Sequence, residues 1–274
     1  MLSKAELSRK EIIDYARAGP EVVFYIGRHG ATWQNAEAGV SADRERSWSN
    51  APILQEGAEE ARKSAIRLKT EGIGVIYCSD LVRSCQTAEI IGDILGIEPK
   101  SSTKLRPWNM GSLTNKLQSQ ADPIIAAYAR KKPDMAVPEG ESFNNFKRRA
   151  FRGVAEAVGN YPDKTVLLVT HLRIDSLLRA WQAAGQPISH GINVDEFLKR
   201  GDAPGSFRVF KTHLPLLWGE LDDKLTHAEA HYHRGYEPQF CRTCEYSNHM
   251  SKPTCGLVKD ISPAGWCRLW EAVA

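Results

Sequence analysis

Short apolar runs alternate with longer amphipathic stretches along this chain. Three runs, rich in β-branched and aromatic residues, are typical of buried strands: residues 21–27, 75–79 and 165–170. The amphipathic stretches have helical spacing and cover residues 3–18, 57–70, 81–95, 121–132, 141–159 and 172–184. An edge strand is predicted at residues 206–212. Because strands that alternate with helices form βαβ units, we expect an α/β fold with three layers, αβα, and a mostly parallel sheet.

Polar side chains follow each of the three apolar runs. Arg28 and His29 come after the first run, Ser79 ends the second with Arg83 one helical turn later, and His171 follows the third. If the strands are parallel neighbours, their carboxyl ends share one rim of the sheet, where ligands bind. Guanidinium groups form bidentate hydrogen bonds with phosphate oxygens, and a neutral imidazole can attack phosphorus. The pattern therefore predicts a pocket for a phosphate dianion.

Composition narrows the functional classes. Hydrophobic residues make up 42% and charged residues 25% of the 274 positions, which is typical of a globular protein. A formal net charge of +3 gives no indication of a nucleic-acid or membrane-surface partner. The apolar runs are too short to cross a membrane, and the charged N-terminal stretch does not resemble a signal peptide. We therefore expect a cytoplasmic protein in a reducing compartment.

Four segments occur in an order that resembles the histidine phosphatase (phosphoglycerate mutase-like) superfamily. They are RHGATWQN from residue 28, SDLVRSCQTAE from residue 79, PEGES at residues 138–142 and VLLVTH ending at residue 171. The resemblance covers roughly residues 20–213. It implies an enzyme, a phosphoric ester hydrolase that acts through a phosphohistidine intermediate on an unidentified phosphorylated substrate. No cofactor is needed for that phosphoryl transfer.

The resemblance also assigns roles to individual residues. His29 matches the nucleophile that becomes phosphohistidine. Arg28, Arg83 and His171 match the catalytic residues that clamp the phosphoryl group. Three further residues match positions that contact the phosphate or build the rim of its site: Asn35, Glu141 and Ser142.

The chain departs from the family pattern where most relatives carry a carboxylate general acid. The corresponding positions hold Pro107 and Asn109, which cannot act as acids. Loss of a general acid costs about 10²–10⁴-fold in rate, and less with a good leaving group such as an acyl phosphate. Candidates that could replace this general acid are Glu37, Asp43 and Glu141. A second departure is Leu172, which stands where the family usually has a glycine after the second histidine. The alternative is a non-catalytic protein that binds a phosphorylated ligand or serves in protein interaction.

Cysteines crowd the end of the chain with the spacing C-x2-C-x10-C-x11-C. They are Cys241, Cys244, Cys255 and Cys267. The GWCRLW and HYHRGYEPQFC segments around them resemble high-potential iron–sulfur proteins, which implies a 4Fe-4S cluster; zinc is the alternative, and disulfides or free thiols remain open. We expect four parts: an N-terminal helix (1–19), the α/β domain (20–213), a linker (214–226) and a small four-cysteine metal-binding module (227–274) that could dock a protein partner.

Overall fold

The computed structural model describes residues 16–35, 44–199, 201–219, 233–234 and 265–266 of the chain. It separates into two units, residues 1–219 and 220–274. The predicted N-terminal helix falls mostly outside the described residues, and so do Glu37 and Asp43. None of the helices in the described ranges is long and apolar enough to cross a membrane.

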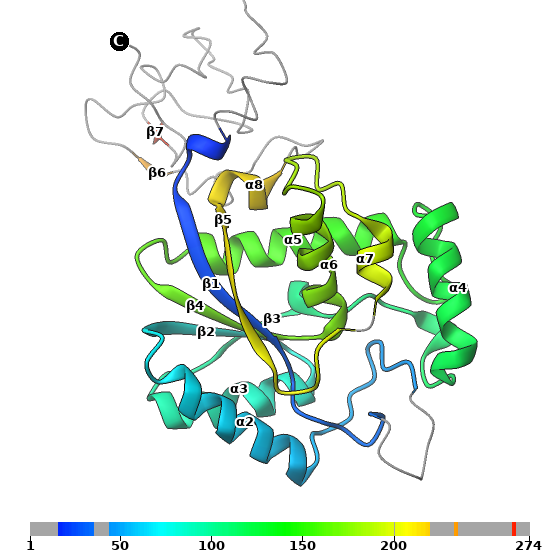
Figure 1. Ribbon diagram of the computed structural model, residues 1–274, viewed down its shortest axis with the longest axis horizontal. Coiled ribbons are helices and arrows are strands. Elements are labelled where there is room, and N and C mark those ends of the chain that lie inside the picture. Colours follow the sequence, from blue (N-terminus) through cyan, green and yellow to red (C-terminus); the bar gives the residue numbers. More distant parts are fainter. Residues whose placement is uncertain (1–15, 36–43, 200, 220–232, 235–264, 267–274) are drawn as a thin grey trace, which may run out of the picture. The chain divides into compact units, whose positions relative to one another are not determined.

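A five-stranded sheet forms the centre of the first unit (Figure 1). Its order is β3-β2-β4-β1-β5, and the strands are β1 (Glu21–Arg28), β2 (Ile73–Ser79), β3 (Lys100–Ser102), β4 (Thr165–Thr170) and β5 (Phe207–His213). The first four are parallel, whereas β5 pairs with β1 in antiparallel fashion. This confirms the α/β class and the mostly parallel sheet. The short strand β3 was not predicted, because three residues carry no hydrophobic period.

Helices cover both faces of this sheet. Figure 1 shows α2 and α3 on one face and α5 and α6 on the other. The bounds are α2 (Gln55–Leu68), α3 (Val82–Leu95), α4 (Gln118–Lys131), α5 (Phe143–Gly159), α6 (Leu172–Ala183), α7 (Val194–Leu198) and α8 (Leu214–Trp218), with 3-10 turns η1 (Thr103–Leu105) and η2 (Gly111–Leu113). The predicted domain boundary at residue 213 precedes α8, whose five residues are buried and belong to the first unit.

The core lies between the sheet and each helical layer. On one face Ile76 and Leu167 pack against Ala61 and Ile91 of the helices. On the other face aromatic rings meet, and the Trp181 and Phe210 centroids lie 6.2 Å apart. Residues 166–170 of β4 are all buried, which explains why this strand has an uninterrupted apolar sequence rather than an alternating one.

The register of the central strands brings the predicted site residues to one edge. In the pairing of β1 with β4, Arg28 lies opposite Thr170, so both strands end at the same level. The backbone N–H of His29 donates to the carbonyl of Thr170 over 3.0 Å, which continues the ladder by one residue. Gly27 is required beside it, because a Cβ atom there would lie 2.2 Å from the ring of Phe207.

The second unit is described at two short strands only. β6 (His233–Arg234) pairs with β7 (Gly265–Trp266) in antiparallel fashion. The cysteines Cys241, Cys244, Cys255 and Cys267 lie outside the described residues, and the metal-binding module therefore stays a prediction. Among the described residues, no group of three or more His, Cys, Asp or Glu side chains is placed to hold a metal ion.

Candidate active site

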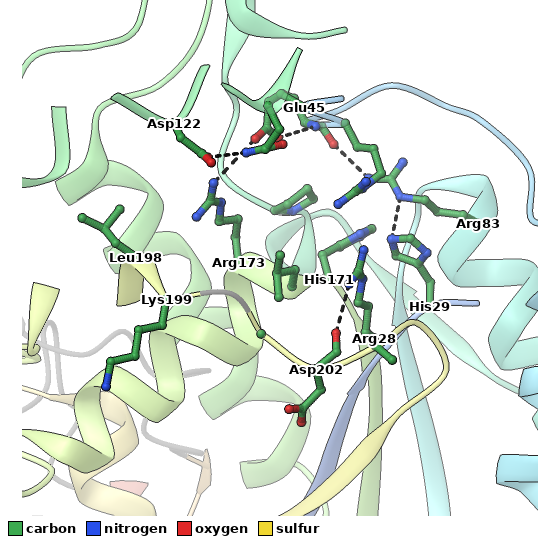
Figure 2. A pocket seen from close by; sticks show the side chains of 17 residues that line it. Arg28, His29, Glu45, Arg83, Asp122, His171, Arg173, Leu198, Lys199 and Asp202 are labelled. Atoms are coloured by element: carbon green, nitrogen blue, oxygen red, sulfur yellow. Dashed lines mark hydrogen bonds and ion pairs between the residues drawn. The ribbon is translucent and has the colours of Figure 1, made fainter. Parts of the chain in front are cut away.

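A cavity of about 230 Å³ opens at the carboxyl ends of the central strands. Arg28, His29, Arg83 and His171 all line it, and we call these four residues the nucleophile wall (Figure 2). The two histidines follow β1 and β4 directly, and Arg83 projects from the first turn of α3. The imidazole centroids of His29 and His171 lie 5.1 Å apart. The structure thus brings together the four residues for which the sequence predicted a shared rim.

His29 is oriented with one ring nitrogen toward the cavity. Its Nδ1 lies 2.8 Å from the carbonyl oxygen of Gly30, which can only accept, so Nδ1 carries the hydrogen. Its Nε2 therefore holds a lone pair, and this atom accepts a hydrogen bond of 3.1 Å from Nε of Arg83. Burial, with Arg83 and then Arg28 nearby, lowers the pKa of His29 well below its ordinary value. The imidazole is consequently neutral and nucleophilic at neutral pH.

Arg83 is held on three sides. Besides its bond to His29, Nη2 donates to the carbonyl of Ser47 over 2.9 Å and Nη1 donates to the carbonyl of Ser49. Ser47 adopts a left-handed φ of 43°, which turns its carbonyl toward the guanidinium. Burial and then Arg46 lower the pKa of Arg83 to about 9, so the group still carries its charge at neutral pH.

His171 presents a ring nitrogen that no described residue satisfies. Its Nε2 lies 2.8 Å from the hydroxyl of Ser79, and its Nδ1 is buried without a hydrogen-bond partner among the described residues. The Ser79 hydroxyl already accepts from the backbone N–H of Leu81 over 3.2 Å, and its hydrogen can be donated to Nε2. Nδ1 then carries the hydrogen and is a donor for an anion in the cavity. Burial, followed by Arg83, lowers the pKa of His171 well below its ordinary value.

Arg28, the last residue of β1, is the fourth member of the nucleophile wall. Its side chain is buried, and Nη1 donates to the carbonyl of Asp202 over 3.0 Å. This bond fixes the guanidinium at the mouth of the cavity beside His171, as Figure 2 shows. Two neutral imidazoles and two cations therefore face one small space, which is an environment that stabilises a dianion.

Three other predicted site residues do not line this cavity. The side-chain oxygen of Asn35 accepts from the N–H and the hydroxyl of Thr32, both at 2.9 Å, and closes its own turn. Glu141 accepts from Arg149 and from the backbone N–H of Asn109, at 2.5 and 2.9 Å. Ser142 caps α5 by accepting from the backbone N–H of Asn145. In this structure all three support the loops around the site, and their contact with phosphate stays a prediction.

The cavity has a second side, of which the sequence analysis singled out Pro107 alone. Glu45, Pro107, Asp122 and Arg173 line it, and we call these residues the opposite wall. Glu45 is buried; one carboxylate oxygen accepts from the backbone N–H of Ser47 over 3.0 Å. Its other oxygen lies 3.6 Å from Nη2 of Arg173. The position of Arg173, two residues after His171, was the available signal, since a strand end and the first turn of the next helix share one rim.

Comparison with known proteins finds a matching family and a relative of known sequence. A family model described as "Histidine phosphatase superfamily (branch 1)" matches residues 24–195, more than half of the chain. The chain is 32% identical over 151 residues to a "Probable phosphoglycerate mutase GpmB" of Yersinia pestis (strain Pestoides F), across 54% of this chain and 68% of that protein.

Two solved structures share this fold. A mycobacterial glucosyl-3-phosphoglycerate phosphatase aligns with a TM-score of 0.56 and 23% identity, over 70% of this chain and 91% of its own. A protein from Thermus thermophilus aligns with a TM-score of 0.50 and 26% identity, over 68% of this chain and 92% of its own. At 23% identity, the mycobacterial alignment carries information on the fold alone.

Proposed function

This chain belongs to the histidine phosphatase superfamily, and from that premise we propose that it is a phosphohydrolase acting through a phosphohistidine at His29. One observation carries the proposal. The Nε2 lone pair of a buried, neutral His29 faces a cavity that Arg28, Arg83 and His171 also line. The substrate is a phosphorylated small molecule.

The first step transfers the phosphoryl group to His29. Its Nε2 attacks phosphorus while the bond to the leaving oxygen breaks, and Nδ1 keeps its hydrogen on the carbonyl of Gly30. Arg83 must release Nε2 as the substrate enters, and its N–H groups then turn to the phosphoryl oxygens. Arg28 and the Nδ1 hydrogen of His171 stabilise the charge that these oxygens carry in the transition state.

The second step is the attack of water on phosphohistidine. Orthophosphate leaves and His29 returns to its neutral form. A mutase would instead pass the phosphoryl group back to the substrate, an alternative that the name of the 32%-identical relative supports. The two are separated by the product: a hydrolase releases orthophosphate in proportion to substrate consumed, whereas a mutase yields an isomeric phosphoester.

Trapping of the intermediate tests the proposal. The purified full-length chain is mixed with phosphorylated substrates carrying radiolabelled phosphorus, then quenched in alkali, in which phosphohistidine survives. We expect label on the wild-type chain and none on His29→Asn, which approximates the size of the ring but has no nucleophilic nitrogen lone pair. His213→Asn is the matched control, because His213 bonds to the carbonyl of Gly19 far from the cavity.

A non-catalytic role is the second candidate, and Pro107 favours it. This residue lines the cavity where relatives carry an acid, so the site could bind a phosphorylated ligand without turnover. Orthophosphate would then raise the melting temperature while no substrate labels His29. Efficient turnover with a labelled intermediate excludes this candidate.

For the C-terminal segment we propose a metal site at Cys241, Cys244, Cys255 and Cys267. The C-x2-C pair and two later cysteines support a 4Fe-4S cluster, with zinc as the alternative. A reducing cytoplasm suits either metal, and a metal-bound module could dock a protein partner. Metal analysis and an absorption spectrum test this: iron with a band near about 400 nm supports the cluster. A colourless protein with zinc supports the alternative, and a metal-free protein overturns the proposal.

A further inference from the structure

The opposite wall of the cavity holds charged groups, yet its carboxylates are not placed to donate a proton. One carboxylate oxygen of Glu45 accepts from the N–H of Ser47, and the other forms an ion pair with Arg173. Asp122 is exposed and accepts from the side-chain amide of Gln118 over 2.5 Å. Asp202, the third carboxylate that lines the cavity, forms an ion pair with Arg208. A substrate whose leaving oxygen must be protonated therefore meets, among the described residues that line this cavity, no carboxyl group without a hydrogen-bond or ion-pair partner.

Arg173 stands out on this wall by its place in the fold. It lies in the first turn of α6, where the partial positive charge of the helix terminus opposes a cation. Its closest charged neighbour is Glu45 at 3.6 Å, beyond hydrogen-bond distance, and its guanidinium lies over the ring of Phe197. Arg173 makes no hydrogen bond to another described residue, so its N–H groups are available to an anion inside the cavity.

Arg173 lies on the far side of the cavity from the nucleophile. Figure 2 shows Arg173 across the cavity from His29, with Arg28 and His171 between them. In an in-line displacement the leaving oxygen departs on the side away from the attacking nitrogen. Arg173 consequently lies on the side where negative charge develops on the leaving group.

We propose that Arg173 receives the leaving group as an oxyanion, and that the substrate is a phosphoanhydride: an acyl phosphate or a diphosphate. This inference rests on the proposed phosphohydrolase function and names its substrate class. A carboxylate or phosphate leaves as a stable anion and matches the fork of a guanidinium. An alkoxide is too basic to leave without the proton that a general acid supplies.

The reaction balances without an added acid. The Nε2 lone pair of His29 forms the N–P bond, and the electron pair of the breaking P–O bond stays on the bridging oxygen of the carboxylate or phosphate. Water then forms a new O–P bond, the N–P electron pair returns to Nε2, and both water protons leave with orthophosphate as its monoanion. Arg173 acts in the first step only, because the leaving group has departed before water attacks.

A leaving-group series on the full chain tests the substrate class. We would measure kcat/KM for acetyl phosphate, inorganic diphosphate and glycerol 3-phosphate. We expect one of the two anhydrides to exceed the alkyl ester by at least about 10²-fold. The faster anhydride identifies the leaving group as carboxylate or phosphate. An alkyl ester hydrolysed as fast as both anhydrides overturns the inference.

Rapid-quench kinetics test the role of Arg173. Arg173→Gln should slow the formation of phosphohistidine from the preferred anhydride by about 10²–10³-fold and leave its hydrolysis by water unchanged. Arg130→Gln, the same substitution at an exposed arginine paired with Asp195, should change neither step. Equal slowing of both steps in Arg173→Gln would show general damage to the cavity and contradict the assignment. Glu45→Gln should retain the preference for anhydrides; loss of the residual alkyl-ester activity alone would identify Glu45 as an acid and overturn the inference.

These outcomes separate the two proposals. If no substrate labels His29 of the wild-type chain, the phosphohydrolase proposal fails and this inference fails with it. If glycerol 3-phosphate labels His29 as rapidly as the anhydrides, the phosphohydrolase proposal stands and the substrate class alone is wrong.

Discussion

The two walls of the cavity are built in different ways. Each histidine of the nucleophile wall directly follows a parallel strand, and the backbone ladder reaches as far as His29. The opposite wall is assembled from separate loops and helix starts that carry Glu45, Pro107 and Arg173. Hydrogen bonds of the sheet thus position the proposed nucleophile, whereas loop residues line the side on which the proposed leaving group would depart. Chemistry that needs fixed geometry resides on the sheet, and selectivity resides on segments that can change without disturbing it.

Among the predictions made here, the largest effect is expected from removing Arg83, one of the two cations of the nucleophile wall. Arg83→Gln should lower kcat by about 10²–10³-fold, because the phosphoryl oxygens lose a charged donor and His29 loses the group that orients its lone pair. It also leaves the carbonyls of Ser47 and Ser49 without this partner, so the melting temperature should fall. Steady-state kinetics and thermal unfolding measure the two effects. Arg62→Gln on the exposed face of α2 is the control and should match wild type in both.

The sequence predicts the nucleophile wall better than the opposite wall, because the first is built on strands and the second on loops. The apolar runs before His29 and His171 predict strands, and strand ends in a parallel sheet predict a common rim. Arg83 follows because it lies one turn into the helix after β2. Glu45 was not predicted, since its burial depends on the pairing of its backbone with Lys116 and Asn115, which are distant in sequence. Asn35 and Ser142 have structural roles that the family pattern did not indicate, in a turn and a helix cap, and their contact with substrate stays a prediction.

A substitution can introduce a general acid into the opposite wall. Pro107→Glu should raise kcat/KM for glycerol 3-phosphate by about 10–10²-fold, part of the contribution of a general acid, and leave acetyl phosphate nearly unchanged. The backbone carbonyl of Pro107 accepts from Trp48 and Arg149, and these bonds do not require proline. Pro107→Gln has the same size without the acid and should give no gain. Equal gains from both variants would mean that removal of the proline ring, rather than proton donation, was responsible.

A milder perturbation addresses the tautomer of His171. Ser79→Ala removes the hydroxyl that lies 2.8 Å from Nε2, so the hydrogen of His171 is no longer directed to Nδ1. We expect kcat to fall by about tenfold, the effect of one neutral hydrogen bond, with little change in KM. Ser79→Thr retains the hydroxyl and should recover most of the activity. If alanine and threonine behave alike, the hydroxyl does not orient His171 and the donor role of Nδ1 is wrong.

The last prediction concerns lowering the pH, which should act mainly on the free energy of unfolding. Burial lowers the pKa of His29 and His171 well below 6.5, and lowers that of His190 to about 4. The unfolded chain therefore binds more protons than the folded chain below pH 6.5, and the free energy of unfolding should decrease as pH falls from there toward about 4. His190 lies against Phe151 and bonds to the carbonyl of Leu216, away from the cavity. His190→Gln should flatten part of the pH dependence of urea unfolding while the acid limb of kcat/KM, set by the neutral imidazole of His29, stays where it is in wild type.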